Sequence, residues 1–175
     1  TEAGERVIDL LRRNGILSVK NGCDGEGTCG ACTILLNGKS VNSCQLLSPQ
    51  IDGCDVRTSE SLAKNNQLHV IQQAFLDTGV VQCGYCTPSM LVATLELLER
   101  NPEPSEDDIK DALSGIICRC TGYKQIFDAI EVAVKRMKGD KDYKKEYPSF
   151  RKDLRIVGKS TTKVDGHQLL CTDPS

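Results

Sequence analysis

The chain has 175 residues, 26% charged and 39% hydrophobic, a balance typical of a soluble globular protein with one sizeable domain or two small ones. Its formal net charge of -2 at pH 7 leaves no basic face large enough for nucleic acid, and no apolar run is long enough to span a membrane. The N-terminal stretch TEAGERVIDLLRRNG has no apolar core followed by a small-residue cleavage site, so the expected location is cytoplasmic.

The ten cysteines are the most informative part of the composition. Cytosolic thiols are kept reduced, so metal binding explains this many cysteines better than a set of disulfides does. Eight of them form two groups of four, one in the first quarter of the chain and one spanning its middle, whereas Cys54 and Cys171 stand alone. The sequence therefore predicts two sites of four thiolates each.

The first group has the spacing C-x5-C-x2-C-x11-C and consists of Cys23, Cys29, Cys32 and Cys44. This is close to the plant-type [2Fe-2S] pattern of C-x4-C-x2-C with a distant fourth cysteine, with one more residue between the first two. Three glycines in the same stretch, Gly25, Gly27 and Gly30, can take positive φ values without a Cβ penalty and let backbone N–H groups approach the sulfurs. A zinc knuckle is the competing interpretation.

A hairpin is predicted directly after this loop. The segment TILLNGKSVNSC consists of two β-rich runs joined by Asn37 and Gly38, which is a strong two-residue turn signal. Such a hairpin brings Cys44 back to the loop that holds the other three cysteines of the group.

Four helical segments are predicted in the second half of the chain. LHVIQQAFLDTG indicates a helix that ends at Gly79, and SMLVATLELLERN indicates a second with Pro88 in its first turn. DDIKDALSG indicates a third, opened by a capping box from Ser105 to Asp108, and YKQIFDAIEVAVKRMK carries apolar residues every four positions. Two antiparallel helices between the cysteine pairs return the chain to its starting end.

The second group has the spacing C-x2-C-x31-C-x-C and consists of Cys83, Cys86, Cys118 and Cys120. Because the helices between the pairs return the chain, the two pairs meet at one end of the helical unit. Taken by itself, this spacing favours iron no more than zinc, since paired short cysteine motifs also make closed tetrahedral zinc sites.

Three longer stretches carry a resemblance to a known family: GEGTCGACTILLNGKSVNSC, GVVQCGYCTPSMLVATLELL and ALSGIICRCTGYKQIFDAI. They resemble the two-cluster [2Fe-2S] small subunit, or N-terminal iron-sulfur segment, of the molybdenum hydroxylases, the xanthine dehydrogenase and aldehyde oxidoreductase group. The purine hydroxylases are the most similar in overall pattern. The resemblance runs from the start of the chain to about Met137, and it tips the balance from zinc to iron at the second site.

The resemblance implies an α+β fold in three parts. Residues 1-62 would form an N-terminal β-grasp plant-type ferredoxin domain, and residues 63-138 an all-α four-helix [2Fe-2S] domain. Residues 139-175 would form an extended linker or tail, without helical period, that leads to or packs on a molybdenum-binding subunit. The hairpin that normally opens a β-grasp domain is not in this sequence, so a preceding segment is expected.

The resemblance also implies the ligands and partners. The first group of cysteines would hold one [2Fe-2S] cluster and the second group another, and Gln82 matches a glutamine that contacts the pterin in relatives. No catalytic residue is expected in this chain, because hydroxylation of a purine-like heterocycle would occur at a molybdopterin cofactor in a large partner subunit or domain. Electrons would then pass through the two clusters to FAD in a flavin-binding subunit, or to another acceptor.

Two alternatives remain at this point. A freestanding two-cluster ferredoxin would use the same cysteines to carry electrons between other proteins. A zinc-stabilised interaction module would use them for structure alone, without redox chemistry.

Overall fold

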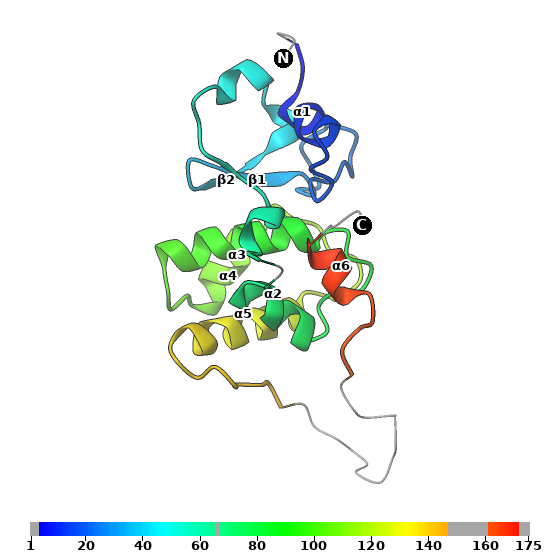
Figure 1. The fold of residues 1–175 in the computed structure, drawn as a ribbon. Coiled ribbons are helices and arrows are strands. Elements are labelled where there is room, and N and C mark those ends of the chain that lie inside the picture. Colours follow the sequence, from blue (N-terminus) through cyan, green and yellow to red (C-terminus); the bar gives the residue numbers. More distant parts are fainter. Residues whose placement is uncertain (1–3, 66, 147–160, 172–175) are drawn as a thin grey trace.

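The computed structural model describes residues 4–65, 67–146 and 161–171. The chain forms an N-terminal module with one helix and a small sheet, which lies against a helical module (Figure 1). The mixture of helices and a small antiparallel sheet agrees with the predicted α+β class. None of the helices in the described ranges combines the length and apolar character needed to cross a lipid bilayer.

The sheet of the N-terminal module has three antiparallel strands in the order β2-β1-β3. Its strands are β1 (Thr33–Leu36), β2 (Lys39–Asn42) and β3 (Val56–Arg57). Between β1 and β2, Asn37 and Gly38 have φ values of 49° and 79°, the two positive angles that a type I′ turn requires. The predicted hairpin is therefore confirmed, with Thr33 opposite Asn42.

Helix α1 (Val7–Arg13) packs against this sheet and its connections. Val7 and Ile8 are fully buried and share one apolar cluster with Ile34 of β1. Three short 3-10 turns complete the module: η1 (Ser43–Gln45), η2 (Ser48–Ile51) and η3 (Ser59–Leu62). Two of the cysteines predicted as ligands, Cys32 and Cys44, belong to the same cluster, so the module's core also positions the segments that carry them.

All four predicted helical segments are helical in the second module. They are α2 (Val70–Asp77), α3 (Thr87–Arg100), α4 (Glu106–Leu113) and α5 (Lys124–Met137). Pro88 lies in the first turn of α3, where its missing N–H costs nothing, and Ser105 caps α4 by accepting from Asp108 N. Helix α2 packs on α5 and α3 packs on α4 around one continuous apolar core.

The two modules touch along β1, β2 and α3 (Figure 1). The backbone N–H of Ser40 donates to Oε2 of Glu96 at 2.8 Å, and the guanidinium of Arg57 forms an ion pair with Glu99 at 2.9 Å. At a second point, a Cβ on Gly30 would lie 2.1 Å from the carbonyl oxygen of Gly115, so the two backbones are in direct contact. These contacts fix the position of the N-terminal module, with its cysteines, relative to the helical module.

The expectation of an extended tail is wrong for Gly166–Cys171, which forms the short helix α6. Leu170 is fully buried and belongs to the core of the helical module, where α6 contacts η3, α2 and α3. Tertiary packing of this kind stabilises helices too short to persist alone, so a local sequence period cannot reveal them.

Candidate metal centres

The first three cysteines, Cys23, Cys29 and Cys32, lie in the loop between α1 and β1, and Cys44 lies in η1 after the hairpin. The glycines of this loop have the positive φ values expected from the sequence: 88° at Gly25, 76° at Gly27 and 67° at Gly30. The loop therefore winds through left-handed conformations that residues with a Cβ rarely adopt.

Side chains that flank Cys44 attach it to this loop. Ser43 donates to the carbonyl oxygen of Cys32 both from its backbone N–H, at 3.3 Å, and from its hydroxyl, at 2.8 Å. Nε2 of Gln45 lies 2.5 Å from the carbonyl oxygen of Gly25 and 3.4 Å from Sγ of Cys44. The hairpin thus returns Cys44 to the side of Cys32.

The four thiols of the first group fall into two pairs. Hydrogen bonds from Cys29 and Thr28 lower the pKa of Cys23 to about 6. Burial, with Cys44 as the neighbouring thiol, raises the pKa of Cys32 to about 11. The pairs are therefore Cys23 with Cys29 near the surface and Cys32 with Cys44 in the core, and Ala31 N points at Sγ of Cys29 from 3.5 Å.

The second group lies at one end of the helical module. Cys83 and Cys86 are in the turn that opens α3, and Cys118 and Cys120 are in the loop from α4 to α5. This loop is built around Tyr123, whose φ is 67°. Its hydroxyl donates to the carbonyl oxygen of Ile116 and accepts from the backbone N–H of Cys118, both at 3.0 Å.

The second group also consists of two pairs. Cys86 and Cys118 are buried, with 9% and 8% of their surface exposed, whereas Cys83 and Cys120 are exposed. Burial raises the pKa of Cys86, and the side chain of Cys83 raises that of Cys120. Burial also acts to raise the pKa of Cys118, but hydrogen bonds from Thr121, Cys86 and the Cys120 backbone together outweigh it, and the pKa is lowered.

All four cysteines of the second group line a single cavity of about 140 Å³. A [2Fe-2S] core takes four thiolates, two at each iron, so four cysteines around one cavity match its ligand demand.

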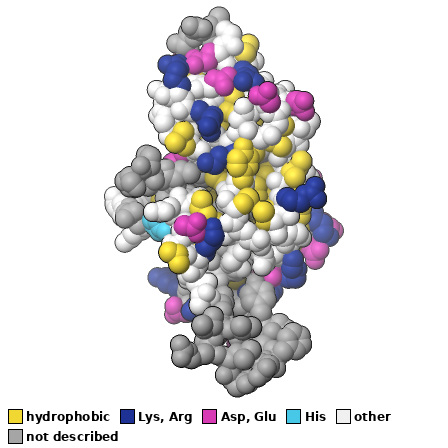
Figure 2. Space-filling view, turned by 90° about the vertical axis from the view of Figure 1, so that its right-hand side faces the viewer, with side chains coloured by type: hydrophobic (Ala, Val, Ile, Leu, Met, Phe, Trp, Pro, Cys, Tyr) yellow, Lys and Arg dark blue, Asp and Glu magenta, His cyan; other side chains and the backbone are white. Residues whose placement is uncertain are grey.

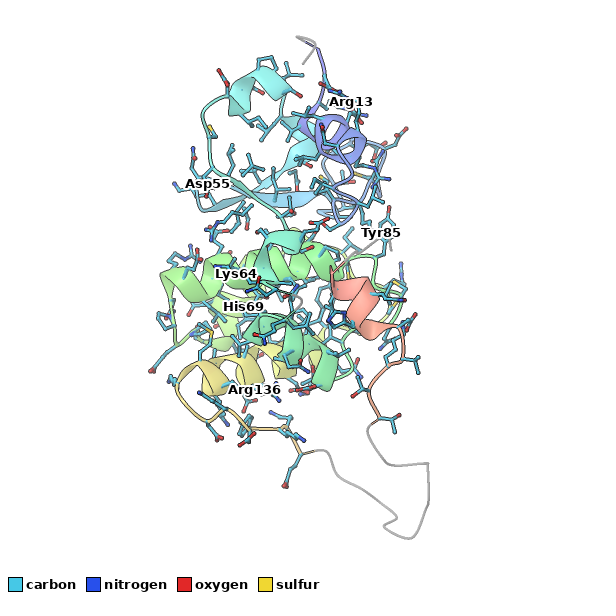
Figure 3. The ribbon with its side chains drawn as sticks, in the orientation of Figure 1. Arg13, Asp55, Lys64, His69, Tyr85 and Arg136 are labelled. Atoms are coloured by element: carbon cyan, nitrogen blue, oxygen red, sulfur yellow. The ribbon has the colours of Figure 1, made fainter. Side chains whose placement is uncertain are left out.

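The loops of the two groups contact each other directly. The backbone N–H of Ile117, next to Cys118, donates to the carbonyl oxygen of Cys29 at 3.0 Å. Tyr85, between Cys83 and Cys86, donates its hydroxyl to the carbonyl oxygen of Asn21 at 2.7 Å, and Figure 3 shows it at the boundary of the modules. Figure 2 shows apolar side chains gathered in the upper middle of the face turned to the viewer.

Gln82 is exposed beside the outer pair of the second group and lines the same cavity. Its side-chain nitrogen donates to Oε1 of Gln125 at 3.1 Å, and its carbonyl oxygen accepts from Nζ of Lys163 at 2.8 Å. The contact with Lys163 has no sequence signal, because the two residues are far apart in the chain.

The sequence assigns neither isolated cysteine to a group. Cys54 is half-buried just before β3 rather than inside a strand, and the side chain of Cys171 lies outside the described part. Sequence reasoning missed Tyr123 and Thr121, which hold the Cys118 loop; their position within the motif ICRCTGY is the only signal that could have pointed to them.

Comparison with known proteins matches two families. Residues 1–63 match a 2Fe-2S iron-sulfur cluster binding domain, and residues 58–131 match a [2Fe-2S] binding domain. The chain is 47% identical over 137 residues to the nicotinate dehydrogenase small FeS subunit of Eubacterium barkeri, covering 78% of this chain and 87% of that subunit.

Two larger proteins match almost the whole chain. A probable hypoxanthine oxidase of Escherichia coli (strain K12) is 40% identical over 171 residues, 98% of this chain but 18% of the oxidase. The crystal structure of an aldehyde oxidoreductase from Desulfovibrio desulfuricans superposes with a TM-score of 0.87 at 34% identity, covering 98% of this chain and 19% of that one. The same unit thus occurs both as a small subunit and within longer polypeptides.

Proposed function

The chain belongs to the iron-sulfur subunits of the molybdenum hydroxylases, and from that premise we propose that each of its two cysteine groups holds one [2Fe-2S] cluster in an electron-transfer path. The observation that carries this proposal is the one cavity that all four cysteines of the second group line, together with the hydrogen bonds that return Cys44 to the side of Cys32 in the first group. Residues 1-62 are proposed as a β-grasp ferredoxin domain and residues 63-138 as a four-helix domain, in line with the two family matches.

The proposed ligands are Cys23, Cys29, Cys32 and Cys44 for the first cluster and Cys83, Cys86, Cys118 and Cys120 for the second. A bound [2Fe-2S] cluster accepts and gives up one electron at a time. Two donors of this chain would stabilise negative charge on the ligand sulfurs. The backbone N–H of Ala31 points at Sγ of Cys29, and the side-chain amide of Gln45 points at Sγ of Cys44. Such hydrogen bonds help to set the potential of a cluster.

The contact between Ile117 and Cys29 supports passage of electrons between the two sites. This single hydrogen bond of 3.0 Å connects the backbone next to one ligand with the backbone of another. The two cysteine loops are therefore in direct contact, without an intervening layer of protein.

We assign the partners by the side on which each site opens. Gln82 and the exposed pair Cys83 and Cys120 would face a molybdopterin-binding large subunit or domain, with Gln82 near the pterin. The N-terminal loop would face the next carrier, proposed as FAD in a flavin-binding subunit. The substrate is proposed as a purine-like heterocycle, in keeping with a relative named for hypoxanthine, and the location as cytoplasmic.

Single cysteine substitutions test the ligand assignment. In the native holoprotein, Cys44→Ser and Cys86→Ser should each abolish or alter a different one of two electron paramagnetic resonance signals, since each removes a thiolate from a different site. Cys54→Ser is the matched control and should leave both signals and the iron content unchanged. Loss of a signal in the Cys54 variant, or full retention of both in the other two, would refute the assignment.

A further inference from the structure

We propose that residues 161–171, called the arm below, hold the Gln82–Cys86 loop in position and thereby set the environment of the second cysteine group. This inference rests on the proposed function for its consequence, but its contacts stand independently of it. The arm is separated from that loop by about half the chain, and Figure 1 shows α6 beside the helical module. Three steps support the proposal: an anchor, a contact and a dependence of the loop on that contact.

The anchor is α6, which inserts into the helical module. Leu170 is fully buried, and the carbonyl oxygen of Leu170 accepts from Nε2 of Gln72, itself fully buried, at 3.4 Å. Gly166 lies so close to α2 that a Cβ on it would be 2.3 Å from Cδ1 of Leu76. The arm is therefore anchored in the helical module by its two buried residues, Gly166 and Leu170.

Two side chains of the arm contact the loop, one at Gln82 and one at Gly84. A Cβ on Gly84 would lie 3.1 to 3.2 Å from three carbons of Leu169, so the side chain of Leu169 rests on the loop backbone between the two cysteines. Nζ of Lys163 donates to the carbonyl oxygen of Gln82 at 2.8 Å and is held by an ion pair with Asp165 at 3.0 Å. One apolar and one polar contact thus secure the residues on both sides of Cys83.

The loop has an irregular backbone that depends on such contacts. Residues 80–86 form neither helix nor strand, and Gly84 has a φ of 80°. Irregular segments with exposed backbone open locally with low free energy unless other parts of the protein cover them. By covering Gly84, Leu169 also reduces the access of water to the loop next to Cys83, and solvent access is one of the factors that sets the potential of an iron-sulfur cluster.

This assigns Lys163 and Leu169 as positioning residues for the second cluster. They act through the backbone of Gln82 and Gly84, the residues on either side of Cys83. An arm with a purely structural role would affect the whole helical module equally, whereas a positioning arm acts on one loop.

Hydrogen–deuterium exchange with mass spectrometry on the holoprotein distinguishes these roles. The variants are Lys163→Met and Leu169→Ala, and the matched control is Val164→Ala, because Val164 is fully exposed. The proposal predicts that peptides covering residues 80–86 exchange about tenfold faster in both variants, as expected when local opening becomes easier. Peptides covering residues 90–98 of α3 and 126–134 of α5 should keep their wild-type rate, and so should all peptides of the control.

Electron paramagnetic resonance of the same reduced samples provides a second readout. One of the two signals should shift in both variants while the other stays unchanged. Unchanged exchange in residues 80–86, or equal acceleration in residues 80–86 and in the α3 and α5 peptides, would overturn the proposal. A protein that contains no iron would refute the proposed function instead, and the exchange comparison would still decide whether the arm holds the loop.

Discussion

At the scale of single residues, position 30 requires glycine for two reasons, one from its own loop and one from the helical module. Its φ of 67° is unfavourable for any residue with a Cβ, and that Cβ would lie 2.1 Å from the backbone oxygen of Gly115. The clash is with backbone, so no side-chain rotation relieves it. The sequence motif explains the positive φ, but the contact with Gly115 arises only when the helical module packs on the loop.

Gly30→Ala should therefore destabilise the protein by at least about 2 kcal/mol, from left-handed backbone strain plus overpacking at the junction. Gly53→Ala is the matched control, since Gly53 has a φ of 71° with no atom within 4 Å of its Cβ position, and it should cost about 1 kcal/mol from strain alone. Urea unfolding of both holoproteins measures the difference. Equal losses would show that the junction tolerates a methyl group at residue 30.

The cysteine spacing predicts two groups of four, but it does not say which thiols of a group lie closest to each other. The pairing of Cys86 with Cys118 depends on how α3 and α4 fold back on each other and on the hydrogen bonds of Tyr123. These are interactions between residues of different elements, and spacing along the chain contains no direct information about them. The same reason explains why the role of Lys163 beside Gln82 could not be predicted.

At the scale of elements, the N-terminus of α2 contains a pH-sensitive cap. Nδ1 of His69 accepts from the backbone N–H of Ile71 at 3.4 Å, and Oε1 of Gln72 accepts from the backbone N–H of His69 at 2.9 Å. Only the neutral imidazole can accept at Nδ1, and burial lowers the pKa of His69 below 6.5.

Because the folded-state pKa is lowered, the unfolded chain takes up a proton first as the pH falls. The cap's contribution is therefore complete above the unfolded pKa of 6.5 and is lost as the pH falls through the lower folded value. His69→Asn keeps a capping side chain that does not titrate, so wild type and variant should differ most at low pH, by up to about 1 kcal/mol. Unfolding in urea at about pH 7.5 and about pH 5.5 tests this. A stability difference that does not change with pH would contradict it.

Regular elements were predictable where local signals were strong. The apolar repeats, Pro88 and the Ser105 capping box predicted α3 and α4 because these signals act within a few residues. Helix α6 escaped prediction because its stability comes from burying Leu170 in a distant groove. The turn between β1 and β2 was predictable for the opposite reason, since Asn37 and Gly38 provide the required angles themselves.

At the scale of the whole molecule, β1 packs on α3, and the two cysteine loops, which are far apart in sequence, are in contact. This arrangement suits a chain that passes electrons in series, because each site has one side towards the other and one side towards the surface. The surface side of the second site carries Gln82 and the exposed cysteine pair, and the surface side of the first carries Cys23, whose pKa is lowered to about 6. Composition and periodicity contained no information about this relative placement.

The most direct test of the account is low-temperature electron paramagnetic resonance on the dithionite-reduced native protein, with iron, zinc and molybdenum quantified in the same sample. The account predicts two distinct S = 1/2 signals and about four iron atoms per chain, two for each cluster. Molybdenum that co-purifies in a larger complex would identify the partner. Zinc without iron, or iron with a single signal, would contradict the central claim that the two paired cysteine groups each hold a [2Fe-2S] cluster.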